Sequence, residues 1–171
     1  FGLSMAHIGK YDFIAETPVL RPVTDRVIYS LVYATRKAIG LEVFRDSQIS
    51  AIRDQADLRG KAKVEAKQSK STQGELFDSF AEMAPDMLLT SLAEDQKNAE
   101  TTLLERSPLL PDAIRFEEIW PDVLSRHMVR KTEVAAIAAR LRAEGRLIFP
   151  DWEPRVRRPK DHYRVSRPSA A

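Results

Sequence analysis

The alternation of apolar and polar residues near the start of the chain predicts an antiparallel pair of strands. Residues alternate from Phe13 to Leu20, and Val27–Ala34 is a continuous run of β-branched and aromatic residues. Between the two runs, residues 21–26 supply the proline and the polar side chains of a turn. The second run is apolar on both faces. We therefore expect a strand that is covered on both sides, which requires more protein than this segment supplies.

After Gly40 the apolar residues recur at the spacing of a helix, at Leu41, Phe44, Ile49 and Ile52. Residues 57–72 have few apolar side chains and many lysines, which is typical of a flexible or loosely helical linker. We interpret this charge run as a solvated connection, and a direct contact with a polyanion is the alternative. Residues 73–77 read Gln-Gly-Glu-Leu-Phe. They resemble the peptide with which bacterial proteins bind the replication sliding clamp, and a hydrophobic anchor for the linker is the alternative.

The last part of the chain predicts three helices. The first covers Met87–Glu105, and the second has an apolar stripe at helical spacing, at Phe116, Ile119, Trp120, Val123 and Leu124. Pro121 within this stripe indicates a kink, or a helix that begins close to it. In the third helix we expect Thr132 to be the N-cap and Gly145 to end the helix.

A hairpin with a basic loop follows the third helix. We expect a short strand at Arg146–Phe149, a loop at Pro150–Asp161 and a return strand at His162–Ser166. Helix, helix, tight turn, helix, strand, basic loop, strand is the order of a winged helix-turn-helix domain. The expected fold is therefore α+β. A strand pair and a helix occupy residues 1–56, a charged linker occupies 57–86, and a winged helix-turn-helix domain occupies 87–168.

Charge is distributed unevenly along the chain, which has a net charge of only +2. From Arg126 onward there are twelve lysines and arginines and five acidic residues, a net +7, which leaves −5 for the residues before it. This asymmetry indicates a polyanionic partner. We predict that eight cations contact nucleic acid: Arg130, Lys131, Arg142, Arg155, Arg157, Arg158, Lys160 and Arg164.

The third helix of such a domain can enter the major groove. Its solvent face is expected to carry Lys131, Ala135, Ala139 and Arg142. Alanines read no base edge, so we expect phosphate contacts and little sequence preference. The basic loop is expected to lie along a phosphate backbone or to enter a minor groove. The alternative is that the winged helix binds a protein.

The chain offers few residues for catalysis or metal binding. It has no cysteine, which excludes disulfides, thiolate metal sites and cysteine nucleophiles within the chain. His7, His127 and His162 form no ligand-like pair, and we expect His127 and His162 to lie on the surface or to pack against the basic loop. We predict no catalytic, cofactor-binding or metal-binding residue here. Trp120 is expected in the core, whereas Trp152 is open to either packing or stacking on a base.

No run of residues is long and apolar enough for a membrane span, and the first residues do not have the order of a signal peptide. We therefore expect a cytoplasmic protein that does not contact a membrane. The chain begins at Phe1 rather than at a methionine, so we also expect a fragment of a longer protein.

Four stretches resemble the three-Cys-motif partner proteins, which are bacterial and phage-associated proteins found beside a partner with a radical-SAM-like three-cysteine motif. The stretches are Tyr29–Arg36, Gly40–Asp46, the linker that contains Leu76 and Phe77, and Leu141–Ile148. The resemblance implies a class I methyltransferase-like Rossmann domain whose sheet ends in an antiparallel pair. Residues 1–56 would then be the edge of this truncated domain.

The resemblance also implies that the cofactor loop of that domain lies in a front half that this chain lacks, so no cofactor is expected in this fragment. Whether the full-length protein is a methyltransferase-like enzyme is left open. The first hypothesis is that the winged helix docks the assembly on nucleic acid. The rival hypothesis is that it binds the three-Cys-motif partner protein.

Overall fold

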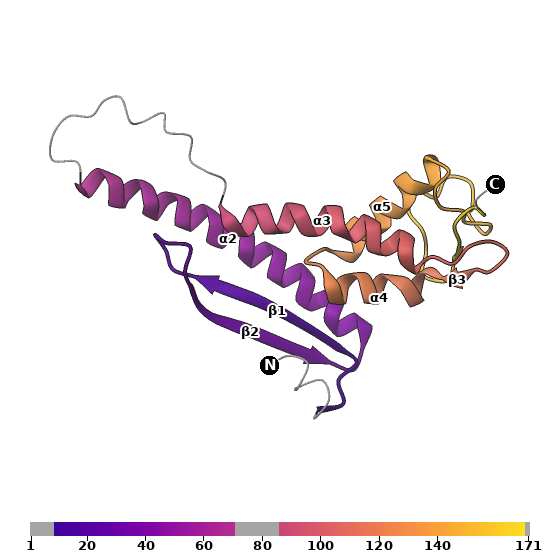
Figure 1. The fold of residues 1–171 in the computed structure, drawn as a ribbon, viewed down its shortest axis with the longest axis horizontal. Helices are drawn as coiled ribbons and strands as arrows, with labels where there is room; N and C mark the ends of the chain where they lie inside the picture. Colours follow the sequence, from indigo (N-terminus) through magenta and orange to yellow (C-terminus); the bar gives the residue numbers. More distant parts are fainter. Residues whose placement is uncertain (1–8, 71–85, 170–171) are drawn as a thin grey trace.

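The computed structural model describes residues 9–70 and 86–169, and this part of the chain has a mixed α+β fold with four helices and two small antiparallel sheets (Figure 1). The elements in chain order are β1 (Phe13–Leu20), β2 (Val27–Thr35), α2 (Ala38–Lys70), α3 (Met87–Arg106), β3 (Ile114–Arg115), α4 (Phe116–Arg126), α5 (Lys131–Ala143) and β4 (Arg164–Val165). The clamp-like stretch 73–77 lies outside the described residues. No described helix is long and apolar enough to cross a membrane.

The first two strands form the antiparallel hairpin that the sequence predicts. Ala15 lies opposite Tyr33, Thr17 lies opposite Leu31, and the register shifts next to Leu20. The ring of Tyr33 stacks on Phe44 of α2, with 4.6 Å between the ring centroids. One face of the hairpin therefore packs against α2, which Figure 1 shows running alongside both strands.

Helix α2 continues through the segment that the sequence analysis interprets as a linker. It ends at Lys70 rather than near residue 56, so the part of the expected linker that the structure describes before residue 71 is regular helix. Lysine, glutamate, glutamine and alanine are good helix formers even without an apolar stripe. One long-range interaction also fixes this region, because Arg59 is only 2% exposed and donates hydrogen bonds to Asp25 and Asp86.

The C-terminal helices follow the predicted order, with corrected boundaries. The predicted apolar stripe of α4 is buried, and the helix begins at Phe116, so Pro121 lies within it. Helix α5 begins at Lys131, and its N-cap is Arg130 rather than Thr132. The Glu133 carboxylate explains this start because it accepts a hydrogen bond of 2.8 Å from the Arg130 backbone N–H.

Gly145 ends α5 as predicted. Its φ of 73° lies in the left-handed region that glycine tolerates best. The backbone N–H of Arg146 donates to the carbonyl of Leu141 at 2.9 Å, and the N–H of Gly145 donates to the carbonyl of Arg142 at 3.1 Å. These two bonds satisfy carbonyls in the last turn of the helix.

The expected C-terminal hairpin is present only as very short pairings. β3 pairs with β4, with Ile114 opposite Val165, and Ile148 forms an antiparallel bridge with Ser166. The predicted strand at Arg146–Phe149 is thus reduced to one bridge. The segment between the paired residues, 150–161, contains turns and no regular element.

One hydrophobic core joins the two halves of the described chain. Ala15 of β1 and Leu41 of α2 belong to the same buried cluster as Phe116, Val134 and the other core residues of the C-terminal half. Arg45 of α2 adds a polar link. Its Nε donates to the carbonyl of Leu124 at 2.7 Å, and its Nη2 donates to the carbonyl of Ser125 at 3.2 Å. The boundary predicted at residues 56–57 is therefore not a break in the packing.

Candidate nucleic-acid interface

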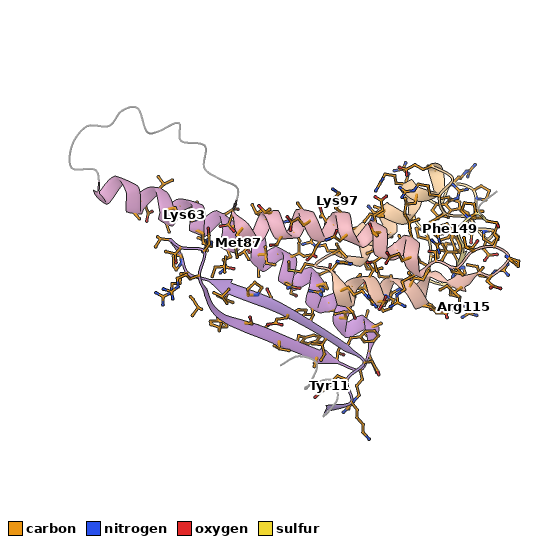
Figure 2. The ribbon with its side chains drawn as sticks, in the orientation of Figure 1. Tyr11, Lys63, Met87, Lys97, Arg115 and Phe149 are labelled. Atoms are coloured by element: carbon orange, nitrogen blue, oxygen red, sulfur yellow. The ribbon has the colours of Figure 1, made fainter. Side chains whose placement is uncertain are left out.

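The eight predicted cations lie in three places at the C-terminal end of the molecule. Figure 2 shows the side chains crowded around Phe149 in this region. Arg130 and Lys131 are at the start of α5, and Arg142 is in its last turn. The other five follow in the loop 150–161 and in β4: Arg155, Arg157, Arg158, Lys160 and Arg164.

Two of the loop and strand cations are neutralised by neighbouring carboxylates. The Nζ of Lys160 lies 2.8 Å from both carboxylate oxygens of Glu153. Arg164 makes a bidentate contact with Asp151, at 3.0 Å from Nε and 3.1 Å from Nη2. The hydrogen bonds from Lys160 and Arg164 lower the pKa of Glu153 and Asp151 respectively. Both carboxylates are therefore ionised at neutral pH, and these two cations carry little unbalanced charge.

The cations at the start of α5 face the rest of the protein. Arg130 donates to the hydroxyl of Ser50 in α2 at 2.9 Å and lies 3.6 Å from Asp46. The ammonium of Lys131 lies 2.9 Å from Asp161, 3.5 Å from Glu42 of α2, and 4.3 Å from the ring centre of Trp120. Side chains of α2 thus partner both cations at the start of α5.

The exposed face of α5 also differs from the predicted one. Ala135 is only 8% exposed and belongs to the core, and Ala139 is half-buried. The exposed positions are instead Thr132, Ala136, Arg140, Arg142 and Ala143. The apolar stripe in the sequence identifies the side of α5 that packs on α3 and α4. It does not show that side chains of α2 also contact the start of α5.

Acidic side chains neutralise further cations near the end of α5. Glu100 of α3 accepts hydrogen bonds from both Arg140 and Arg146, the latter at 2.6 Å. The hydrogen bond from Arg140 is the largest cause of the lowered pKa of Glu100. Glu100 cannot be identified from the sequence because it lies 40 residues before Arg140 and 46 before Arg146, and the packing of α3 on α5 brings it close to them.

Four predicted cations have no carboxylate partner among the described residues, and we call them the free-arginine cluster. Three are exposed residues of the loop 150–161, and the fourth stacks on that loop: Arg155, Arg157, Arg158 and Arg142. The guanidinium of Arg142 lies 4.4 Å from the ring centre of Trp152. Because Arg142 is exposed and has no carboxylate partner among the described residues, it extends the positive surface of the loop onto α5.

Trp152 fixes the shape of this loop. Its indole N–H donates to the carbonyl of Val156 at 3.0 Å, and its ring packs edge-on against Phe149, with 5.4 Å between the ring centroids. The ring is half-buried. The structure therefore favours the packing role over base stacking for Trp152, while Trp120 is in the core as predicted.

His127 is neither on the surface nor next to the loop. Its Nε2 lies 2.8 Å from the hydroxyl of Thr102 in α3, and its Nδ1 lies 3.5 Å from Asp95. Asp95 also accepts a hydrogen bond from the Met128 backbone N–H at 3.0 Å. These contacts of Thr102 and Asp95 join α3 to the residues at the end of α4, and Thr102 is buried there. His162 is exposed and packs edge-on against Tyr163.

Among the described residues, no group of three or more histidine and acidic side chains is placed to hold a metal ion. The free-arginine cluster is a part of the C-terminal surface that is available to a charged ligand.

Comparisons with protein families, with curated proteins and with solved structures find no match to this chain.

Proposed function

We propose that residues 87–168 are a winged helix-turn-helix domain whose wing binds the phosphate backbone of nucleic acid with little sequence preference. The order of elements supports this proposal: α3, β3, α4, α5, the bridge at Ile148, a loop and β4. In this arrangement the loop 150–161 corresponds to the wing. The proposal gives the main contact to the wing and not to the start of α5, where side chains of α2 lie.

The observation that carries the proposal is the free-arginine cluster. A cation already paired with a carboxylate must give up that partner before it binds a phosphate, whereas Arg155, Arg157 and Arg158 only exchange water. The packing of Trp152 orders the loop before binding, which reduces the entropy lost on association. The exposed alanines of α5 make no polar base contact, so the cluster is expected to read charge and backbone shape.

The resemblance to the three-Cys-motif partner proteins supplies a setting for this proposal. The wing would dock an assembly that contains a methyltransferase-like Rossmann domain and a three-cysteine partner protein on nucleic acid. The present chain would belong to one component of that assembly. In this proposal the chain itself contributes contacts and orientation, and no residue of it is assigned to catalysis or to a cofactor.

A salt titration tests the proposal. We expect the full chain to bind random-sequence duplex DNA, with an affinity that falls steeply as salt rises. Replacing Arg155, Arg157 and Arg158 with alanine should reduce the slope of log affinity against log salt by about 0.9 for each phosphate that the variant no longer neutralises. The control variant removes three exposed cations elsewhere, at Arg21, Lys61 and Lys97.

The control separates the wing from general positive charge. If the two triple variants lose the same affinity, binding follows net charge and the wing has no special role. If the native chain binds weakly even at low salt, nucleic acid is not the ligand, and the rival function of docking on a protein takes its place. Testing single-stranded DNA in parallel shows which form the wing prefers.

A further inference from the structure

Strand β2 is a sheet edge without the usual protection. Residues 27–35 contain no charged residue and no proline, the two devices that most often prevent an edge strand from pairing further. Four of its apolar side chains are between 49% and 56% exposed: Val27, Ile28, Tyr29 and Leu31. Among the described strands, β2 pairs only with β1, so the backbone groups of its other edge have no strand partner.

The position of α2 leaves room beside this edge. Successive side chains of a strand alternate between its two faces, so Tyr29 and Leu31 share the face of Tyr33, whose ring stacks on Phe44 of α2. Of the two strands, it is β1 that accepts side-chain hydrogen bonds from the helix. Its Gln48 and Gln55 side chains donate to carbonyls of β1, at 2.9 Å and 3.3 Å. The same face of β2 is therefore only partly covered.

Helix α2 also has exposed apolar side chains. Around the axis of α2, Leu58 and then Val43 come next to Phe44, on the side away from Gln48. These two side chains are 65% and 60% exposed. Both β2 and α2 thus have exposed apolar side chains.

We propose that β2 accepts an extended segment of another polypeptide as a third strand, and that this segment is apolar in the middle and acidic at its ends. The charges that border β2 define the acidic ends. Arg26 precedes the strand, and Arg36 and Lys37 follow it. Arg36 donates to backbone carbonyls of Gly9 and Lys10 and stacks on the ring of Tyr11, and it has no carboxylate partner among the described residues. Backbone pairing supplies affinity in this mode, and the flanking charges select the partner.

The same charges disfavour a second copy of this chain as the occupant. An antiparallel pairing of two β2 strands centred on Leu31 would place Arg26 of one copy opposite Arg36 of the other. Like charges at directly opposed positions are destabilising. In the same register Lys37 would lie opposite Asp25, whose carboxylate is already ion-paired with Arg59. A heterologous strand with acidic ends avoids the opposition of Arg26 and Arg36.

Two labelled peptides test the proposal on the full chain. Both alternate valine and threonine over the length of β2, and one has two glutamates at each end where the other has two lysines. We expect the glutamate peptide to bind about tenfold more tightly than the lysine peptide at low salt, as measured by fluorescence anisotropy. Amide hydrogen exchange should show new protection in residues 27–35 when the glutamate peptide is added.

A matched pair of variants locates the site. Leu31 lies in β2 and Leu109 in the connection between α3 and β3, and both are 49% exposed. Leu31→Ser should weaken the glutamate peptide about fivefold, because less apolar area is buried on binding, and Leu109→Ser should leave it unchanged. Equal binding of the two peptides, no binding of either, or protection outside β2 would overturn the proposal. So would a dimer in solution that Leu31→Ser converts to a monomer, because a second copy would then cover the edge.

Discussion

The two ends of the molecule expose opposite kinds of surface. At the C-terminal end, most described cations are balanced by acidic side chains, and the exceptions include the four arginines of the free-arginine cluster. At the hairpin end, charges border β2 but are absent from it, and its exposed side chains are apolar apart from Ser30. Each candidate binding surface consists of side chains that lack a partner within the protein. At the C-terminal end these are arginines without a carboxylate partner, and at the hairpin end they are apolar side chains exposed to solvent.

The comparison also shows that the two surfaces belong to one folded body. Arg45 lies in α2, on the hairpin side, but its guanidinium satisfies carbonyls at the end of α4, on the other side. Burial lowers the pKa of Arg45 to about 10, which still leaves it protonated at neutral pH. A buried cation of this kind makes the docking of α2 on α4 sensitive to its loss.

The largest expected effect tests this connection. Arg45→Ala should reduce the free energy of unfolding by about 4 kcal/mol, because it leaves buried carbonyls without donors and opens a cavity. Urea unfolding followed by tryptophan fluorescence measures it. Both tryptophans lie in the C-terminal half, so the effect must cross the contact between the two halves. The control is Arg53→Ala, at an exposed arginine of the same helix. If Arg45→Ala leaves the tryptophan transition unchanged, the halves unfold independently.

A smaller effect tests the ion pair that anchors the hairpin end. Asp86 accepts a hydrogen bond from Arg59 at 2.9 Å and caps α3 by accepting one from the Leu88 backbone N–H at 3.0 Å. Desolvation raises the pKa of Asp86, but the bonds and charge of Arg59 and the Leu88 N–H outweigh it, so the net shift is downward. Asp86→Asn should cost about 2 kcal/mol of unfolding free energy at neutral pH.

The pH dependence of that loss has a definite sign. A carboxylate whose pKa is lower in the folded state stabilises the fold fully above its unfolded value, here 3.8, and loses the effect as the pH falls through the folded value. The stabilities of the native chain and of Asp86→Asn should therefore converge in acid. Asp54→Asn, at an exposed position of α2, serves as the control. A constant difference across this range would mean that Asp86 acts through its shape and not through its charge.

The sequence predicts the elements whose causes are local. The stripe from Phe116 to Leu124, the end of α5 at Gly145 and the strand pair all follow from spacing or backbone preference within a few residues. The continuation of α2 to Lys70 does not. That segment has no clear apolar period. It is held in place by Arg59, whose hydrogen-bond partners Asp25 and Asp86 are far away in the chain.

The same distinction applies to the candidate site. The sequence identifies a basic C-terminal end, but it cannot show which cations are already neutralised. Lys131 meets Glu42, and Arg146 meets Glu100, only after the helices have packed. Pairs that are close in the chain, such as Glu153 with Lys160, are visible as nearby opposite charges but not as contacts. The free-arginine cluster is therefore a property of the tertiary structure.

The smallest expected effect tests whether pairing, and not the number of cations, controls binding at the C-terminal end. Glu153→Gln removes the carboxylate that holds Lys160, so it should release a fifth cation next to the free-arginine cluster. We expect affinity for duplex DNA to rise about threefold at low salt, with a steeper salt dependence, since one more cation becomes available to a phosphate.

Glu94→Gln changes net charge equally on the exposed side of α3 and is the control. An equal gain from both variants would show that the protein responds to its total charge, and the contrast between paired and unpaired cations would then have no functional meaning. A gain confined to Glu153→Gln requires that the wing itself is the contact surface.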